Sequence, residues 1–387
     1  MMRLVYAEGT HKKIGYDLGY QLKEDIQHNI ILREQDAHSK GIDNCVLSRI
    51  IHTYAALSSP SSLQLMEGMS KGSGVPFESL LRFNALQDIF SPEECTSFAA
   101  VGKATSNGKA FLLKNRDHRY YEDNTISVFQ VMKTADQNVI ASVTVAGSTS
   151  VKMGINRYGL AVCSNTGPTN ENVLTELEPN QLSRGEVLKE ALACTSAKDA
   201  VKYTLGRLVD SQMQIPGILF LVDAHNIYVI EADHTFAVIH ITDGCIVRAN
   251  RFLVVENNDT SVEKEISSIC RYLRGKQLLK ENNGQIDREK LLAFSVDHKN
   301  GPYNNSICRH DRNQKESPTV SAGIMEMDSK YPEKSRISIA LGSPCWAWAH
   351  SDGNFTFQMD EDSKSIPQRF LDGTNFKEFI KSGPFRD

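Results

Sequence analysis

One cysteine, Cys95, stands where the chain changes character and where a nucleophile could be carried. A polar, helix-patterned segment of residues 1–94 precedes it, and a strand-like stretch, 95–101, begins with it. A glycine-bearing turn and a second strand-like stretch follow, and this second stretch ends on Asp117. Because paired strands of a hairpin lie about 4.8 Å apart, we expect the Cys95 thiol and the Asp117 carboxylate to lie side by side.

A thiol is nucleophilic only as the thiolate, so Cys95 needs a base. The nearest histidine in the sequence is His118, and a histidine from a distant part of the chain could also serve. The alternative base is the α-amino group that Cys95 would gain if the Glu94–Cys95 bond were broken. The reference pKa of such an amine is about 8, close to working pH. Asp117 could then orient and stabilise the ammonium, and the residues alone leave both routes open.

The bulk composition limits the partners. The chain has 387 residues, 40% of them hydrophobic and 23% charged, which is typical of a globular protein able to bury a large core. A net charge of -4 gives no electrostatic reason to expect nucleic acid or an anionic membrane as a partner. The start carries no apolar run of a secretory signal, and no stretch approaches ~18 apolar residues. We therefore expect a cytoplasmic protein without a transmembrane helix. Its oligomeric state cannot be read from the sequence.

The other cysteines give no metal signature. Eight cysteines are scattered singly, and no pair has the C-x-x-C spacing of zinc or redox sites. Most are expected to be buried thiols that pack as small hydrophobes. Cys308 and His310 lie close together, but no further ligands follow at matching spacing. The sequence therefore predicts no metal site and no organic cofactor.

The elements that must position Cys95 come in blocks. Apolar residues repeating at fours predict a helix over 12–37, and shorter helices are expected over 45–57, 62–70 and 76–90. After Cys95 the period changes to two, which predicts strands over 110–113, 126–132, 139–146, 153–156 and 160–163. The expected order continues with helices over 184–193 and 197–209, a four-stranded meander between 217 and 248, helices over 261–279 and 287–297, and strands over 319–325, 336–340 and 354–358. Runs of strands separated by runs of helices indicate a layered α+β fold rather than alternating βαβ units.

Several motifs resemble one family. The start Cys95-Thr96-Ser97-Phe98, the return Lys114-Asn115-Arg116-Asp117, and the segment 153–162 (MGINRYGLAV) resemble the isopenicillin N acyltransferase family, also called the acyl-CoA:6-aminopenicillanic acid acyltransferase family. That family belongs to the N-terminal-nucleophile hydrolases. Further matches are 9–19 (GTHKKIGYDLG), 76–84 (PFESLLRFN), 248–252 (RANRF) and 306–310 (SICRH). The resemblance covers nearly the whole chain in the family's order.

The resemblance implies a four-layer αββα sandwich that is made as an inactive precursor. Cys95 would attack the preceding peptide carbonyl and split the chain into residues 1–94, a helical leader that becomes the small subunit, and residues 95–387, the nucleophile-bearing part. The two parts would form one globular domain. The family often has glycine before the nucleophile, and Glu94 stands there in this chain. Glycine tolerates strained backbone geometry that glutamate resists, so the departure bears directly on self-cleavage.

The resemblance also implies roles for individual residues. Cys95 is the nucleophile, its new amine is the base, and Asp117 holds that amine. Asn250 donates from its side chain to the oxyanion, a kind of contact worth about 3–4 kcal/mol of transition-state stabilisation. Asn165 supplies a backbone N–H to the same oxyanion. Arg309 and Lys114 are candidates for binding a substrate carboxylate or for holding the site together.

The expected activity is that of an amide hydrolase or acyltransferase working through a Cys95 thioester. The substrate would be an N-acyl amide or a small peptide-like molecule, and the acyl group would pass to water or to an amine. Two alternatives stay open at this point. One is an uncleaved cysteine hydrolase with a distant base, and the other is a non-catalytic, ligand-binding member of the fold.

Overall fold

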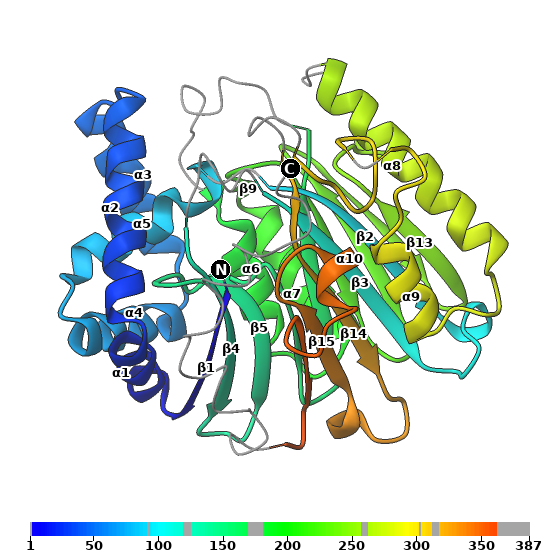
Figure 1. The fold of residues 1–387 in the computed structure, drawn as a ribbon. Helices are drawn as coiled ribbons and strands as arrows, with labels where there is room; N and C mark the ends of the chain where they lie inside the picture. The colour runs from blue at the N-terminus through cyan, green and yellow to red at the C-terminus, as the bar shows by residue number, and fades with distance from the viewer. Residues whose placement is uncertain are drawn as a thin grey trace.

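A computed structural model describes residues 2–90, 93–118, 125–168, 181–256, 262–301, 303–311 and 317–361. Two β-sheets stack face to face, and helices cover both outer faces (Figure 1). The predicted four-layer αββα arrangement is therefore confirmed. Among these residues, every helix is too short or too polar to cross a membrane.

The first sheet contains most of the strands. Among the described residues it has eight, in the spatial order β1 (Met2–Gly9), β4 (Ser127–Thr134), β5 (Val139–Val145), β6 (Met153–Asn156), β7 (Ala161–Thr166), β10 (Gly217–Val222), β11 (Ile227–Ala232) and β12 (Phe236–Ile241). β1 runs parallel to β4, and all other neighbours are antiparallel. The short strands β8 (Gln181–Leu182) and β9 (Gln212–Met213) form a separate pair.

The second sheet carries Cys95. In the part of the chain described here it has six strands, in the order β13 (Gly244–Arg248), β2 (Glu94–Val101), β3 (Ala110–Asp117), β14 (Thr319–Met327), β15 (Arg336–Ala340) and β16 (Asn354–Gln358). All neighbours are antiparallel. The start of β2 therefore lies beside the ends of both β3 and β13, and this edge of the sheet gathers residues that are far apart in the sequence.

Helices form the two outer layers. Against the first sheet pack α1 (His11–Gln21), α2 (Lys23–Ser39), α3 (Asn44–Leu57), α4 (Pro60–Ser73), α5 (Phe77–Phe90), α6 (Arg184–Ala191) and α7 (Ala197–Val209). Against the second sheet pack α8 (Val262–Glu281) and α9 (Arg288–Ser295), while the short α10 (Pro344–Ala347) lies beside β14. Figure 1 shows α1–α5 on one side of the molecule and α8 and α9 on the other.

Three apolar layers separate these elements. Phe129 and Phe220 of the first sheet meet Leu112 and Met325 of the second in the central layer. A second layer joins the first sheet to its helices, and a third joins the second sheet to α8 and α9. Fully burying one such large apolar side chain contributes about 1.5–3 kcal/mol, so the three layers supply most of the driving force for stacking.

The structure corrects two expectations for the leader. The leader is not only helical, because Met2–Gly9 forms strand β1 at the edge of the first sheet. The single helix predicted over 12–37 is two helices that meet at Leu22. The break lets α1 pack against α4 while α2 packs against α5.

The contact between α1 and α4 depends on glycine. A Cβ added at Gly15 would lie 2.1 Å from the carbonyl oxygen of Leu65, and one added at Gly68 would lie 2.1 Å from the carbonyl oxygen of Lys12. Both obstacles are backbone atoms, which cannot rotate away as a side-chain end can. The two helices therefore approach as closely as backbone allows.

Gly15→Ala is expected to lower the free energy of unfolding by about 1–3 kcal/mol, because the helices must separate to admit the methyl group. Gly206→Ala is the matched control, since a Cβ at this position of α7 meets no atom within 4 Å. The control should raise stability by about 0.5–1 kcal/mol through the better helix propensity of alanine. Urea unfolding of both variants measures the difference, and equal effects would contradict the close-packing argument.

Candidate active site

The register of β2 and β3 sets the geometry around Cys95. Cys95 lies opposite Arg116, and Glu94 lies opposite Asp117. Residues directly opposite in an antiparallel pair share a face, and successive residues alternate between faces. The expectation that the Cys95 thiol and the Asp117 carboxylate lie side by side is therefore wrong. Cys95 faces the first sheet, whereas Asp117 lies with Glu94 on the face that packs against α8.

The backbone of Cys95 is held on both sides. Its backbone N–H donates to Oδ1 of Asn250 at 3.0 Å, and its carbonyl accepts from Nη1 of Arg271 at 2.6 Å. The thiol itself is 0% exposed. Burial raises the pKa of this thiol, with Glu93 and Asp117 adding to the rise and Lys114 opposing it. Cys95 is thus a protonated, enclosed thiol in the uncut chain.

Arg271 is a site residue that the sequence analysis missed. From α8 it donates to Oγ1 of Thr96 at 3.0 Å and to Oδ1 of Asn250 at 2.9 Å, besides the carbonyl of Cys95. It is fully buried. A signal was present in the sequence, because Arg271 shares with Ser267, Gly275 and Leu278 the spacing of three or four that marks the buried stripe of a helix.

Glu94 and Arg309 form an ion pair on the same face of the sheet. The carboxylate of Glu94 accepts from Nη1 of Arg309 and lies 3.5 Å from Nη2 of Arg271. The Arg309 guanidinium is buried and also lies 3.6 Å from Oδ2 of Asp117. The side chain that precedes Cys95 therefore neutralises two buried cations.

The two carboxylate oxygens of Asp117 differ in their hydrogen bonding. Its Oδ1 accepts from Oγ1 of Thr319 at 2.6 Å. Its Oδ2 accepts no hydrogen bond from any described residue, although Arg309 and Arg271 lie 3.6 and 3.8 Å away. Burial raises the pKa of Asp117 to about 6, and the two guanidinium groups only partly offset that rise. The carboxylate thus has an open acceptor in a buried, polar environment.

Asn165 and Asn250 connect the two sheets beside Cys95. The Asn165 side chain accepts from the hydroxyl of Ser97 at 2.7 Å and donates to the carbonyls of Arg248 and Ala249 at 3.0 and 2.9 Å. The next residue is Asn250, whose Nδ2 donates to the carbonyl of Thr166 at 2.8 Å. The Asn165 side chain therefore fixes the segment that carries Asn250. The predicted contact of the Asn165 backbone N–H with an oxyanion stays a prediction.

Lys114 lies between the sheets in a buried ionic cluster. Its Nζ donates to the carbonyls of Ser164 and Lys152 at 2.6 and 3.2 Å and lies 3.9 Å from Glu93. Glu93 in turn accepts from Nε of Arg116 at 2.7 Å. Burial opposes ionisation of Glu93, but Arg116, Lys152 and Lys114 outweigh burial and hold the pKa of Glu93 well below its ordinary value. Here Lys114 ties the strands together behind Cys95 and does not face solvent.

Asp117→Asn, made in a Cys95→Ala chain, tests the electrostatics of the uncut site. The pKa of Asp117 is about 6 in the folded protein and 3.8 ordinarily, so folding favours the protonated carboxyl. The resulting stabilisation is complete at pH values below 3.8. That contribution is lost as pH rises through the folded-state pKa. Relative to the asparagine variant, the aspartate protein should lose about 2 kcal/mol of unfolding free energy between pH 4 and pH 7. Urea unfolding at both pH values measures this loss, and a difference independent of pH would refute the shift.

Comparison with known proteins identifies one family. The sequence model described as "AAT: Acyl-coenzyme A:6-aminopenicillanic acid acyl-transferase" matches residues 104–345, more than half of the chain. The matched range includes Lys114, Asp117, Asn165, Asn250 and Arg309, and it begins after Cys95. No curated protein matches the chain.

Solved structures give weaker likenesses. A mutant of conjugated bile acid hydrolase from Clostridium perfringens has 12% identity and a TM-score of 0.41, covering 70% of this chain and 94% of that one. The Caenorhabditis elegans ortholog of N-acylethanolamine-hydrolyzing acid amidase has 16% identity and a TM-score of 0.39, covering 62% and 93%. Penicillin V acylase from Agrobacterium tumefaciens has 14% identity and a TM-score of 0.37, covering 64% and 83%.

Proposed function

The chain belongs to the acyl-coenzyme A:6-aminopenicillanic acid acyl-transferase family, and from that membership we propose that it is an N-terminal-cysteine enzyme that generates its own nucleophile. It is an enzyme of the acyltransferase and amide-hydrolase class. The finer proposal is that Cys95 carries the acyl group as a thioester once the Glu94–Cys95 bond has been cut. The substrate would be an N-acyl amide or a small peptide-like molecule.

One observation carries this proposal: several buried polar side chains converge on the backbone of Cys95, beside the peptide bond that would be cut. Asn250 accepts from the Cys95 N–H of that bond, and Arg271 donates to the Cys95 carbonyl, which belongs to the next peptide unit. Arg271 Nη1 also lies 3.8 Å from the open oxygen of Asp117, which places this carboxylate close to the Cys95 backbone. Burying this many charged and polar groups costs free energy, and such groups gather at functional sites.

The self-cleavage step would proceed by acyl shift. The Cys95 sulfur attacks the carbonyl carbon of Glu94, the C–N bond to Cys95 breaks, and a thioester on the sulfur replaces the amide. The Cys95 nitrogen takes up a proton and becomes a free α-amine. Water then hydrolyses the thioester, which leaves the new carboxyl group on Glu94 and frees the thiol.

Turnover would use the amine as the base. It accepts the thiol proton, the thiolate attacks the substrate carbonyl, and the leaving amine takes the proton back. Asp117 would hold the ammonium through its open oxygen. Asn250 would stabilise the oxyanion with its second N–H, which in the uncut chain is held only loosely, at 3.5 Å from the carbonyl of Glu93. Water or an amine would then release the acyl group.

Intact mass under denaturing conditions tests the cut. The wild-type protein should give two fragments, residues 1–94 and 95–387, because the thiol can attack the preceding carbonyl. Cys95→Ala should give a single chain. Cys163→Ala is the matched control, since Cys163 is also a buried thiol, on neighbouring strand β7, and this variant should still be cut. A single uncut chain in the wild type would refute self-processing.

The rival route, an uncut cysteine hydrolase with a histidine base, receives less support from the contacts. The charged groups that act most strongly on the Cys95 thiol are Lys114, Glu93, Asp117 and Arg184, and none of these is a histidine. Replacing each histidine by glutamine separates the routes. One such change as damaging to turnover as Cys95→Ala would favour the rival. A protein that stays uncut and shows no reactive thiol at Cys95 would instead favour a ligand-binding role.

The ion pairs of Glu94 suggest what kind of acyl group the mature site accepts. We further propose that the Glu94 end moves out of the site after the cut, which would take from Arg309 and Arg271 the carboxylate that neutralises them in the uncut chain. Two buried cations without this counter-ion favour a substrate that supplies one, because a charged hydrogen bond contributes about 1.5–3 kcal/mol. We therefore propose that the substrate's acyl group carries a free carboxylate besides its amide carbonyl.

Amides of one reporter amine with glutaric acid and with butyric acid test this preference. The glutaryl group is a butyryl group that carries a carboxylate on its last carbon. We expect kcat/KM to be at least about tenfold higher for the glutaryl amide. Equal rates on both amides would contradict the acid preference while leaving the thioester mechanism intact, and fragments at Glu94/Cys95 would report on self-processing separately.

A further inference from the structure

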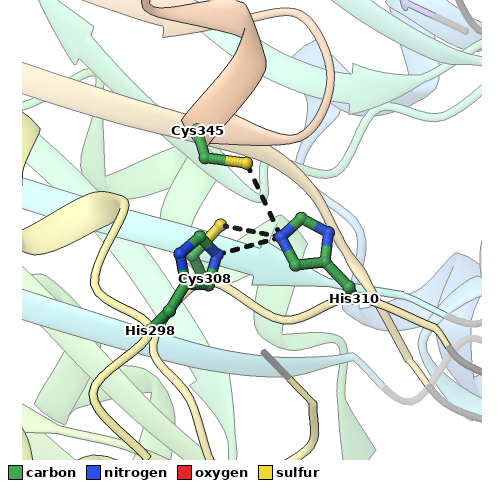
Figure 2. A group of neighbouring side chains, drawn as sticks. All are labelled: His298, Cys308, His310 and Cys345. Atoms are coloured by element: carbon green, nitrogen blue, oxygen red, sulfur yellow. Dashed lines mark hydrogen bonds between the residues drawn. The ribbon is translucent and has the colours of Figure 1, made fainter. Parts of the chain in front are cut away.

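Four metal-ligating side chains meet next to Arg309 in the chain. They are His298, just beyond α9, Cys308 and His310, on either side of Arg309, and Cys345, in the first turn of α10. Their ligand atoms all lie within 4.8 Å of one another. Figure 2 shows the four side chains pointing toward one centre from three separate segments of the chain.

The distances between the donor atoms match a small tetrahedral site. Nε2 of His310 lies 2.9 Å from Nε2 of His298, 3.6 Å from Sγ of Cys345 and 4.0 Å from Sγ of Cys308. Zinc binds imidazole nitrogen at about 2.0–2.1 Å and thiolate sulfur at about 2.3 Å, so the donors of a tetrahedral ion stand roughly 3.3–3.8 Å apart. Of the three separations, the 3.6 Å distance lies within that range, while the 2.9 Å distance is a little shorter and the 4.0 Å distance a little longer.

Hydrogen bonding alone accounts poorly for the arrangement. Three partners converge on the single Nε2 atom of His310, as the three dashed lines in Figure 2 show. An imidazole nitrogen carries either one proton or one lone pair, so it can satisfy one of these contacts and not all three. A cation at the centre gives each of the four donors one bond.

We propose that His298, Cys308, His310 and Cys345 bind a zinc ion. Two thiolates and two neutral imidazoles form one of the common ligand sets of structural zinc, and four protein ligands leave no open position for substrate. Binding releases the two thiol protons, and the two thiolates balance the charge of the ion. The hydroxyl of Ser343, 3.4 Å from Sγ of Cys345, is placed to support that sulfur.

The proposed site departs from the sequence-based expectation that Cys308 and His310 bind no metal. That expectation rested on the absence of further ligands at matching spacing. The fold supplies them from His298, which lies ten positions before Cys308, and from Cys345, which lies thirty-five positions after His310. Ligands this far apart follow no short sequence motif, and the packing of α9 and α10 against β14 brings them together.

A metal here would position the active-site arginine. Arg309 lies between two ligands, and its backbone N–H donates to Oγ1 of Thr319 at 2.9 Å. The same hydroxyl donates to Asp117, and the Arg309 guanidinium pairs with Glu94. By binding Cys308 and His310, the zinc ion would fix the backbone on both sides of Arg309. The contacts of Arg309 with Thr319 and with Glu94 depend on this segment.

Metal analysis of the full-length protein, purified without chelators, tests the proposal. We expect about one equivalent of zinc per chain, retained after dialysis against metal-free buffer. Cys308→Ser and Cys345→Ser should each lose the ion. Cys270→Ser is the matched control, because Cys270 is a half-buried cysteine of α8 outside the cluster, and this variant should keep the zinc.

Cobalt substitution keeps the test decisive if the serine variants do not fold. Wild-type protein in which Co²⁺ replaces zinc should show the thiolate-to-cobalt charge-transfer bands and the intense visible bands of a tetrahedral site. A strong chelator should lower the Tm of the wild-type protein and leave that of a folded Cys345→Ser variant unchanged. Wild-type protein that binds neither zinc nor cobalt would overturn the proposal, and so would a Cys308–Cys345 disulfide in place of free thiols. None of these readouts depends on self-processing or turnover.

Discussion

The alternation of β2 between its two faces is the constraint on which the site depends. Cys95 points between the sheets and Glu94 points toward α8, because neighbouring residues of a strand face opposite ways. The thiol therefore belongs to one environment, bounded by Lys114 and Glu93, and the acid-and-guanidinium cluster belongs to another. The backbone of the Glu94–Cys95 peptide lies where the two environments meet. A chemistry that uses the thiol as nucleophile and the backbone nitrogen as base suits this division.

Ion pairing in the uncut chain explains how so many ionic groups are buried. On the α8 side, Glu94 and Asp117 face Arg271 and Arg309. Between the sheets, Asp88 and Glu93 face Lys152, Arg116 and Lys114. Buried ion pairs of this kind contribute little net stability but are strongly destabilising when one partner is removed. Movement of the Glu94 side chain out of the first cluster would therefore leave that cluster with one negative charge fewer.

Two neighbouring sites share the segment from Cys308 to His310. Arg309 reaches the acid cluster, while the residues on either side of it reach His298 and Cys345. A loop of this kind lies outside the regular ladder of the sheet, so it needs anchors to hold a guanidinium in place. Thr319 on β14 and the proposed zinc ion would supply those anchors from two directions.

The sequence by itself determined the layered α+β architecture, because the change from a four-residue to a two-residue apolar period is local. It also placed most helices and strands within a few residues, although the edge strand β1 and the break at Leu22 were missed. The side of the sheet on which Asp117 lies, the part played by Arg271 and the gathering of His298 and Cys345 were decided only by tertiary structure. Strand register and the packing of α8 and α10 set these contacts, and both depend on residues that are distant in the chain.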